Sequence, residues 1–226
     1  MNGSPLPVRP GSDPFEQLLR LIGPEGPSLS IVDGGANKGR TVARFLEVFP
    51  GSTIRAYEPS RHLSRKLVKR FALQTGVLVR AVALGATAGV MTFNVLESQT
   101  CSSLLSPTGI REKHAGKPMG LARTESVEVV RLDGEMRTAP DIIKLDLQGY
   151  ELEALRGAEG LLHGVTAVLC EVSFADLYQD QPLGGEVTGW MRERGFGLEG
   201  LYAPWFDGAG ELISADALFF RNQVRR

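Results

Sequence analysis

Apolar residues follow two alternating patterns along most of the chain. Short apolar runs, which are typical of strands buried in a sheet, occupy residues 30–33, 54–58, 77–84, 141–146, 167–172, 196–202 and 216–220. Between several of these runs the spacing changes to i, i+3, i+4 and i+7, as in Val42, Phe45, Leu46 and Phe49, which indicates one buried face of a helix. Strands that alternate with helices and end in a hairpin predict a doubly wound α/β fold.

The amino-terminal segment differs from the rest of the chain. Residues 1–12 are rich in proline, glycine and serine and predict a loose arm. Asp13 and Pro14 have the order of a helix cap and a first helical residue, so a short helix is expected to follow. The sequence leaves open whether this helix covers the ligand-binding end of the sheet or only an edge. We therefore expect an arm with a short helix in residues 1–29 and one main domain in residues 30–226.

A second hairpin is expected outside the strand and helix alternation. Residues 89–96 alternate as an exposed strand would, and residues 127–132 are a plausible partner. The polar segment between them, residues 97–125, is long for a connection within one domain, and such loops are more often functional than structural. Ser102 and Ser103 in this segment are candidates for the edge of a substrate-facing lid, or are turn residues.

The first strand runs into a glycine-rich turn with the sequence Asp33-Gly34-Gly35-Ala36-Asn37-Lys38-Gly39. Glycine permits positive φ angles and lets a ligand approach the backbone closely. An acid at the end of the strand favours hydroxyls, amines or a cation over a second anion. A phosphate-binding Walker loop needs Gly-Lys-Ser/Thr, which this turn does not have. The turn therefore predicts a ligand group other than a phosphate.

Two further acids stand at the ends of predicted strands. Glu58 follows the second strand, where nucleoside-binding α/β folds place an acid that binds the ribose hydroxyls. Asp146 follows the fourth strand. Because ligands bind outside the carboxyl ends of parallel strands, Asp33, Glu58 and Asp146 are expected to converge on one crevice.

Composition narrows the class of protein and of partner. The 226 residues, 42% of them hydrophobic and 23% charged, fit one large α/β domain. A net charge of −1 gives no overall attraction to nucleic acid or an anionic membrane, and no apolar run approaches the length of a membrane span. The predicted helix at 60–75 has a basic face without interleaved aromatic residues, which favours a solvated surface over a nucleic-acid site. Two cysteines without disulfide or metal-site spacing, and the lack of a signal pattern, predict a cytoplasmic protein.

Several blocks of the sequence together resemble the FkbM family of S-adenosylmethionine-dependent methyltransferases, which are class I methyltransferases. They cover about residues 30 to 221 in the family's order and spacing, namely 32–39, 57–59, 81–85, 143–151 with 155–158, and 215–219. The resemblance implies a Rossmann-like fold with a seven-stranded, mostly parallel sheet, an antiparallel last strand and helices on both faces. It implies methyl transfer to an oxygen, commonly a hydroxyl of a sugar or secondary metabolite. The acceptor is then a small molecule or glycosyl group, not nucleic acid, and a homodimer is one option for the oligomeric state.

The same resemblance implies which residues bind the cofactor. The glycine turn would hold the methionine part of S-adenosylmethionine through Asp33, Gly35 and Gly39, and Glu58 would bind the ribose. Backbone groups at the tip of the third strand would border the adenine. The implied cofactor-binding residues are Asp33, Gly34, Gly35, Asn37, Gly39, Glu58, Pro59, Val82, Ala83 and Asp146.

Asp146 and Glu171 are the candidate catalytic groups. A methyl sulfonium is already activated, so the protein mainly aligns the acceptor oxygen with the methyl group and takes up the acceptor proton. The family usually has glutamate where this chain has Gln148 and histidine where it has Ser173, so a charge and a base are missing. Asp146 is expected to act as a base, orient the acceptor, contact the amine or bind a divalent ion. A metal site is not predicted because further oxygen ligands are not located, and His114 in the long loop is favoured as a solvent-facing residue over a replacement base.

Two other functions fit the same sequence pattern. A nicotinamide-dependent oxidoreductase also needs a glycine turn and an acid after the second strand, but this turn lacks Gly-x-Gly-x-x-Gly and the chain has no Tyr-x-x-x-Lys pair. A catalytically inactive nucleoside-binding relative is supported by Gln148 alone.

Overall fold

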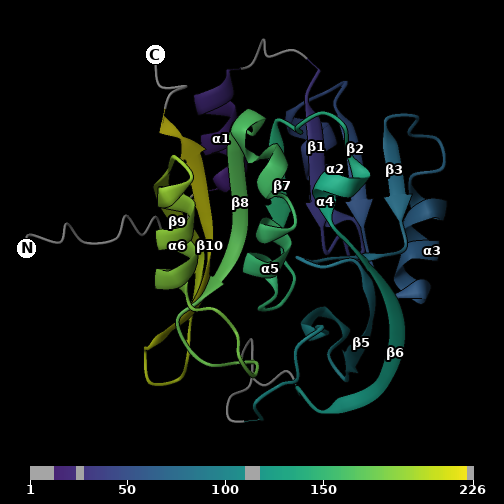
Figure 1. Cartoon of the computed structure of the whole chain (residues 1–226), viewed down its shortest axis with the longest axis vertical. Coiled ribbons are helices and arrows are strands. Elements are labelled where there is room, and N and C mark those ends of the chain that lie inside the picture. Colours follow the sequence, from purple (N-terminus) through teal and green to yellow (C-terminus); the bar gives the residue numbers. More distant parts are fainter. Residues whose placement is uncertain (1–12, 24–27, 110–117, 223–226) are drawn as a thin grey trace, which may run out of the picture.

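The computed structural model describes residues 13–23, 28–109 and 118–222, which include a seven-stranded sheet between two layers of helices (Figure 1). The strands of this main sheet lie in the order β3-β2-β1-β7-β8-β10-β9. They are β1 (Ser30–Gly34), β2 (Thr53–Tyr57), β3 (Val77–Arg80), β7 (Ile142–Leu145), β8 (Ala167–Ser173), β9 (Phe196–Phe206) and β10 (Leu212–Arg221). This arrangement confirms the Rossmann-like α/β fold predicted from the sequence.

β10 runs antiparallel to both of its neighbours, whereas β1, β2, β3, β7 and β8 pair in parallel. Its hairpin with β9 turns at Asp207, whose Oδ1 accepts hydrogen bonds from the N–H groups of Ala209 and Glu211 at 2.9 Å each. The antiparallel last strand is therefore confirmed, and the hairpin that closes the fold has a turn fixed by its own aspartate.

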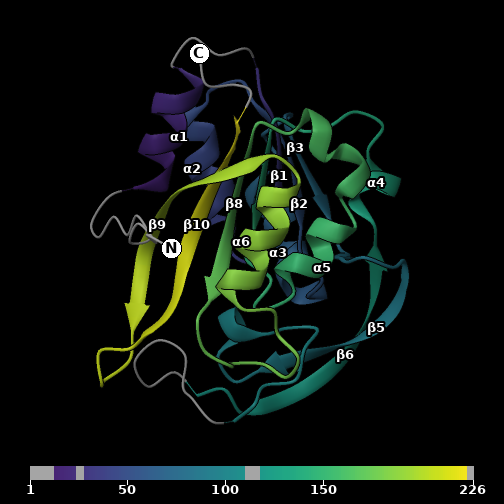
Figure 2. The same cartoon turned by 60° about the vertical axis from the view of Figure 1, so that its left-hand side comes forward.

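Helices cover both faces of the main sheet, as predicted (Figure 2). Buried residues of α1, α2 and α3 pack with β1 and β2 on one face, and those of α5 and α6 pack with β7 and β8 on the other. The helices are α1 (Pro14–Ile22), α2 (Arg40–Val48), α3 (Arg61–Arg70), α4 (Leu132–Glu135), α5 (Glu151–Arg156) and α6 (Gly184–Glu193), with the 3-10 helices η1 (Gln99–Cys101) and η2 (Glu159–Gly164). Within the described ranges, no helix has the length and apolar character needed to cross a membrane.

α1 begins at the residue that its sequence predicts. The Asp13 carboxylate accepts a hydrogen bond from the Phe15 N–H at 2.8 Å, and Pro14 is the first helical residue. Gly23 ends the helix with a φ of 94°. Phe15 packs edge-on against Phe45 of α2, with ring centroids 4.9 Å apart. α1 thus lies against α2, at the end of the molecule opposite the second sheet described below (Figure 1).

Removing the cap of α1 should weaken the fold by a small, measurable amount. We expect Asp13→Ala to lower the free energy of unfolding by about 1 kcal/mol, because one N–H of the first turn loses its acceptor. Urea denaturation measures the change. Asp13 also pairs with Arg44 of α2 at 2.7 Å, so Asp13→Asn, which keeps a capping oxygen but not the charge, is the control. An equal loss in both variants would assign the effect to the ion pair and not to the cap.

A second sheet of three strands lies across the carboxyl ends of β1, β2 and β7 (Figure 1). Its order is β4-β6-β5, with β4 (Ala83–Leu84), β5 (Gly89–Leu96) and β6 (Leu121–Val130). β5 and β6 pair in antiparallel fashion, which confirms the predicted second hairpin. β6 starts at Leu121, so the connection between the two strands is shorter than the 97–125 segment expected from the sequence.

The expectation of a single strand over residues 77–84 is wrong. The main sheet contains only Val77–Arg80, and the chain then crosses to the second sheet, where β4 pairs in parallel with β6. The neighbouring strand β2 ends at Tyr57, opposite Arg80. Backbone groups beyond Arg80 therefore need another partner, since buried N–H and C=O groups are almost always paired.

β5 is not the alternating, exposed strand that its sequence predicts. Its first four residues are exposed or half-buried, and its last four are all buried. Phe93 and Val95 belong to an apolar cluster with Val127 of β6, while Leu96 belongs to a different cluster with Tyr178. The end of β5 is covered on both faces, and this joins the second sheet to the main domain.

Candidate active site

A cleft lies where the second sheet meets the carboxyl ends of β1, β2 and β7. The space between its walls is about 710 Å³, which includes open solvent. Its wall consists of Gly35, Asn37, Tyr57, Glu58, Pro59, Ser60, Leu63, Val82, Ala83, Leu84, Phe93, Val95, Gln99, Thr100, Ser102, Leu104, Asp146, Leu147, Gln148 and Tyr150. Doubly wound sheets bind their ligands at this position.

The glycine turn brings the end of β1 into direct contact with the end of β7. Gly35 has a φ of +74°, and a Cβ at this position would lie 2.0 Å from the carbonyl oxygen of Asp146. Gly39 also has a φ of +74°, and a Cβ there would lie 2.5 Å from the ring of Phe71, the C-cap residue of α3. Gly34 instead ends β1 as a strand residue. Glycine at position 35 therefore sets how closely the turn approaches Asp146.

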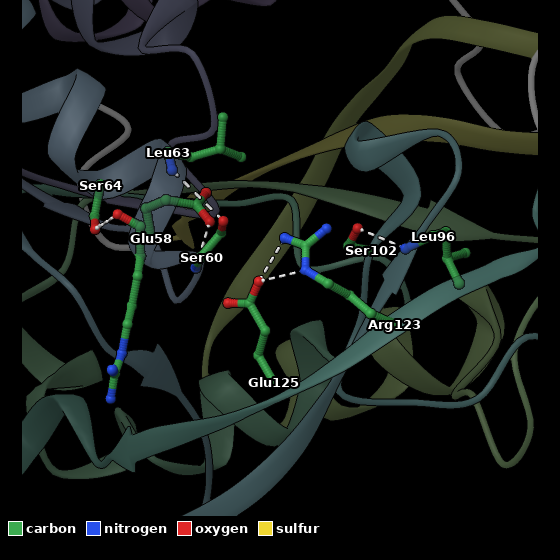
Figure 3. Close-up of polar contacts among 9 residues, drawn as sticks. Glu58, Ser60, Leu63, Ser64, Leu96, Ser102, Arg123 and Glu125 are labelled. Carbon is green, nitrogen blue, oxygen red and sulfur yellow. Dashed lines mark hydrogen bonds and ion pairs between the residues drawn. The ribbon is translucent and has the colours of Figure 1, made fainter.

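Glu58 lies at the end of β2, and two backbone N–H groups hold its carboxylate. Oε2 accepts a hydrogen bond from Asn37 at 2.8 Å, and Oε1 accepts one from Ser60 at 2.9 Å. Figure 3 shows Glu58 beside Ser60, the N-cap of α3. Burial raises the pKa of Glu58 to about 7, although both N–H groups act to lower it. Each carboxylate oxygen has a further lone pair that can accept a ligand hydroxyl in the cleft.

Asp33 lies beneath the cleft and does not form part of its wall. It is completely buried, and its Oδ1 is 3.1 Å from the Nζ of Lys144 on β7. Burial raises the pKa of Asp33, and the charge of Lys144 lowers it in part. Burial acts to lower the pKa of Lys144, but the charges of Asp33 and Asp146 outweigh that effect and raise it. Of the three acids expected to converge, Glu58 and Asp146 line the cleft, whereas Asp33 balances a buried lysine below it.

Asp146 and Glu171 are joined through one amide group. The Nε2 of Gln148 donates hydrogen bonds to Asp146 Oδ1 at 2.5 Å and to Glu171 Oε2 at 3.0 Å. Asp146 lines the cleft, whereas Glu171 does not. A ligand in the cleft would therefore meet Asp146, with Glu171 connected to it through Gln148.

A third acid, Glu151, stands beside this pair at the start of α5. Its two oxygens accept hydrogen bonds from the N–H groups of Leu147 at 2.7 Å and Gly149 at 3.0 Å. Burial and, next, the charge of Glu171 raise the pKa of Glu151 to about 8. One oxygen from each of Asp146, Glu151 and Glu171 lies within 4.8 Å of the others, which is close enough to hold a metal ion. The Gln148 amide and backbone N–H groups supply hydrogen bonds to all three acids.

The second sheet and the segment after β5 form the rest of the wall. Val82, Ala83 and Leu84, together with Phe93 and Val95, give an apolar surface that suits a flat group such as a nucleobase.

The two serines proposed for a lid have different roles. Ser102 lines the cleft, and its Oγ accepts a hydrogen bond from the Leu96 N–H at 3.1 Å (Figure 3). Ser103 is buried, and its Oγ donates to the carbonyl oxygen of Gln148 at 2.8 Å. Ser102 therefore borders the ligand space, while Ser103 ties this segment to the turn after β7.

The family described as "Methyltransferase FkbM domain" matches this chain over residues 33–198, a range that contains Glu58, Asp146 and Glu171. The chain belongs to the FkbM methyltransferase family. Among solved structures, the FkbM methyltransferase from Methylobacillus flagellatus KT is similar, with a TM-score of 0.55 and 18% identity over 85% of this chain and 43% of that chain. An rRNA methylase from Streptococcus thermophilus is also similar, with a TM-score of 0.50 and 11% identity over 92% of this chain and 93% of that chain.

These likenesses define the fold of the FkbM-family chain and leave its acceptor open. At such identities they show the fold alone, and the chain spans less than half of the length of the Methylobacillus protein. A comparison with curated proteins gives no match.

The site residues predicted from the sequence of this FkbM domain fall into two groups. Those that line the cleft are Gly35, Asn37, Glu58, Pro59, Val82, Ala83 and Asp146. Those outside its wall are Asp33, Gly34, Gly39 and Glu171. Sequence reasoning missed Lys144, although a charged residue within the apolar run of β7 is a signal, because a buried charge needs a partner. Tyr178 was also missed, and its loop gives no comparable signal.

The basic face of α3 points away from the core, as predicted for a solvated surface. Arg61, Arg65, Lys66 and Lys69 are exposed and line a separate hollow together with Glu125 of β6. None of these five is part of the cleft wall.

The histidines do not add a base to the cleft wall within the described residues. His62 on α3 and His163 in η2 are exposed. His114, considered above as a replacement base, lies outside the described residues, as does the predicted arm at 1–12.

Proposed function

We propose that the chain is an S-adenosylmethionine-dependent O-methyltransferase that acts on a hydroxyl group of a sugar or small secondary metabolite. The observation that carries the proposal is Glu58. It is a buried carboxylate at the end of β2 that lines one cleft with the Gly35 turn and Asp146, in a member of the FkbM family.

The residues of the cleft fit the three parts of this cofactor. Glu58 offers carboxylate oxygens to the ribose hydroxyls. The turn at Gly35 and Asn37 presents backbone to the methionine part, which would lie beside Asp146. The adenine would lie along the apolar surface at Val82 and Ala83. We infer that Asp33, Gly34 and Gly39 contribute by building the turn, and that Pro59 borders the ribose.

The bound cofactor supplies an activated methyl group on a sulfonium. The protein then has to orient an acceptor hydroxyl and take up its proton. We assign the uptake of the proton to Asp146, which is the acid on the cleft wall. Glu171 supports Asp146 through Gln148 and adds negative charge beside the proton that is transferred.

Two observations support a small acceptor in a reducing cytoplasm. The chain has a net charge of −1, which gives no overall attraction to nucleic acid, and Cys101 and Cys170 are free and buried. The basic residues of α3 line a different hollow.

Calorimetry with S-adenosylmethionine and with NAD separates methyl transfer from the nicotinamide-dependent alternative, which the family match disfavours. Saturable binding of the first and none of the second is the expected result. Consumption of the methyl donor in the presence of candidate hydroxyl acceptors then separates the enzyme from an inactive nucleoside-binding relative. Binding of NAD alone would overturn the proposal.

Glu58→Ala should weaken cofactor binding by about 1–3 kcal/mol, because the ribose hydroxyls lose their acceptor in a buried site. This corresponds to an increase of about 5- to 150-fold in the dissociation constant, measured by calorimetry. Glu47→Ala, on the exposed side of α2 and 70% exposed, is the matched control and should change nothing. An unchanged dissociation constant for Glu58→Ala would remove Glu58 from the site.

The pH dependence of cofactor affinity tests the role of Glu58 independently. Burial raises the pKa of Glu58 to about 7, and the ionised form is the one that accepts two hydroxyls. Affinity should therefore approach its full value at about pH 8 and fall by about tenfold between pH 8 and pH 6. In Glu58→Gln, which cannot ionise, this part of the pH dependence should disappear.

A further inference from the structure

The side chain of Gln148 connects four parts of the chain. Its Nε2 donates to Asp146 at the end of β7, 2.5 Å away, and to Glu171 of β8, 3.0 Å away. Its Oε1 lies 3.1 Å from the hydroxyl of Tyr178, which is also 2.7 Å from the carbonyl oxygen of Cys101 in η1. Gln148 is only 5% exposed. The amide is therefore a fixed part of the site.

These partners also determine which end of the amide faces the acids. The reverse orientation would bring Oε1 against two carboxylates, an arrangement of acceptors alone that is unfavourable unless a proton or a cation lies between them. On the other side, burial raises the pKa of Tyr178, so its hydroxyl keeps its one proton, which the Cys101 carbonyl oxygen at 2.7 Å and Oε1 at 3.1 Å share. Both ends of the amide are thus matched to their neighbours.

The backbone of Gln148 is strained in the conformation that aims its side chain. Its φ of 58° is in the left-handed region, which is unfavourable for a residue other than glycine. The Ser103 hydroxyl holds its carbonyl oxygen at 2.8 Å, and Glu151 holds the N–H of the next residue, Gly149, at 3.0 Å. Such strain persists only where the surroundings hold it, and it concentrates at functional sites.

The amide lies in a group of acids that repel one another. Oxygens of Asp146, Glu151 and Glu171 come within 4.8 Å of one another. Glu151 accepts two backbone N–H groups, and Lys144 lies beneath the group, paired with Asp33 at 3.1 Å. The Gln148 Nε2 is the donor that contacts both Asp146 and Glu171. A divalent cation is the usual alternative for holding carboxylates this close together.

We propose that Gln148 is a positioning residue that takes the place of a cation, holding Asp146 and Glu171 together and keeping Asp146 at the cleft wall. What Asp146 does to an acceptor rests on the proposed function, but the holding of the two carboxylates does not. A glutamate at position 148 would add a negative charge and remove the bridging donor. The group would then need a divalent cation to stay together.

Mn²⁺ is the probe that distinguishes an amide from a cation here, because it prefers oxygen ligands and its binding can be followed by paramagnetic resonance. With the full natural chain, Mn²⁺ should leave the melting temperature unchanged. Gln148→Glu should melt at a lower temperature, regain stability when Mn²⁺ is added, and bind Mn²⁺ at least about tenfold more tightly than the natural chain. Gln148→Met, similar in length but with neither a donor nor a ligand oxygen, should also melt lower, and Mn²⁺ should restore it less than it restores Gln148→Glu, which adds a fourth carboxylate.

The double variant Gln148→Glu with Glu171→Gln exchanges the amide and the carboxylate and keeps the number of charges. Its melting temperature should be higher than that of Gln148→Glu, and Mn²⁺ should no longer change it. This double variant also keeps the proposal testable if Gln148→Glu alone does not fold. The proposal is overturned if the natural chain binds Mn²⁺ as tightly as Gln148→Glu, if Mn²⁺ affects Gln148→Glu and Gln148→Met equally, or if the double variant melts no higher than Gln148→Glu. None of these measurements uses the methyl donor, so a failure here is distinguishable from a lack of methyl transfer.

Discussion

Replacing Lys144 with methionine should lower the free energy of unfolding by about 3–5 kcal/mol, the usual cost of removing one partner of a buried ion pair. The Nζ of Lys144 is 3.1 Å from the Oδ1 of Asp33, and Asp33 is completely buried. Methionine fills a similar volume without charge, so little packing is lost. Asp33 would be left ionised in apolar surroundings or would have to take up a proton. Urea denaturation near pH 7 measures the loss, which should shrink as the pH falls because a protonated Asp33 needs no counter-charge.

Two further variants separate the charge effect from other causes. Combining Asp33→Asn with Lys144→Met removes both charges and should recover much of the lost stability. Arg156→Met breaks a partly exposed ion pair between Arg156 and Glu153, in which the two side chains are 42% and 28% exposed. It should lower the free energy of unfolding by less than about 1 kcal/mol. If Lys144→Met costs no more than Arg156→Met, the ion pair does not stabilise the end of β1.

The main sheet is predictable because its strands and helices have different apolar periods. Val42 and Phe45 are fully buried, as their helical spacing indicates, and β7 and β8 are buried runs that read as central strands. The second sheet is less predictable. Residues 77–84 form one apolar run. The point at which the chain leaves the main sheet for the second sheet depends on β2, which ends at Tyr57. The sequence of β5 predicts a half-exposed strand, but residues distant in the sequence pack against its last four residues and bury them.

The candidate site divides in a similar way. Position at a strand end and chemical type were sufficient to predict Glu58 and Asp146, both of which line the cleft. The same reasoning placed Asp33 with them, because the sequence does not indicate whether an acid at a strand end faces the cleft or the interior. Its partner Lys144 decides this. The sequence shows Gln148 only as a missing charge. Its contacts with Asp146 after β7, Glu171 of β8 and the loop residue Tyr178 depend on the folded chain, which brings these segments together.

Asp146→Asn should reduce turnover by about 100- to 10,000-fold, the range for loss of a general base, if Asp146 takes up the acceptor proton. The substitution keeps an oxygen that can accept the hydrogen bond from Gln148 Nε2, now 2.5 Å from Oδ1, so the geometry of the site should survive. The dissociation constant of S-adenosylmethionine should change much less than turnover. Steady-state kinetics with an active acceptor and calorimetry with the cofactor measure the two quantities separately.

The relative changes in turnover and in the dissociation constant of the cofactor determine which role Asp146 has. A loss of cofactor affinity with little change in turnover at saturating cofactor would place Asp146 on the cofactor amine, because an interaction made equally in the ground and transition states affects KM and not kcat. Glu171→Gln is the matched comparison, since Glu171 does not line the cleft and is linked to Asp146 by Gln148. It should lower turnover less than Asp146→Asn does. A larger loss in Glu171→Gln would make Glu171 the base and leave Asp146 as the group that orients it.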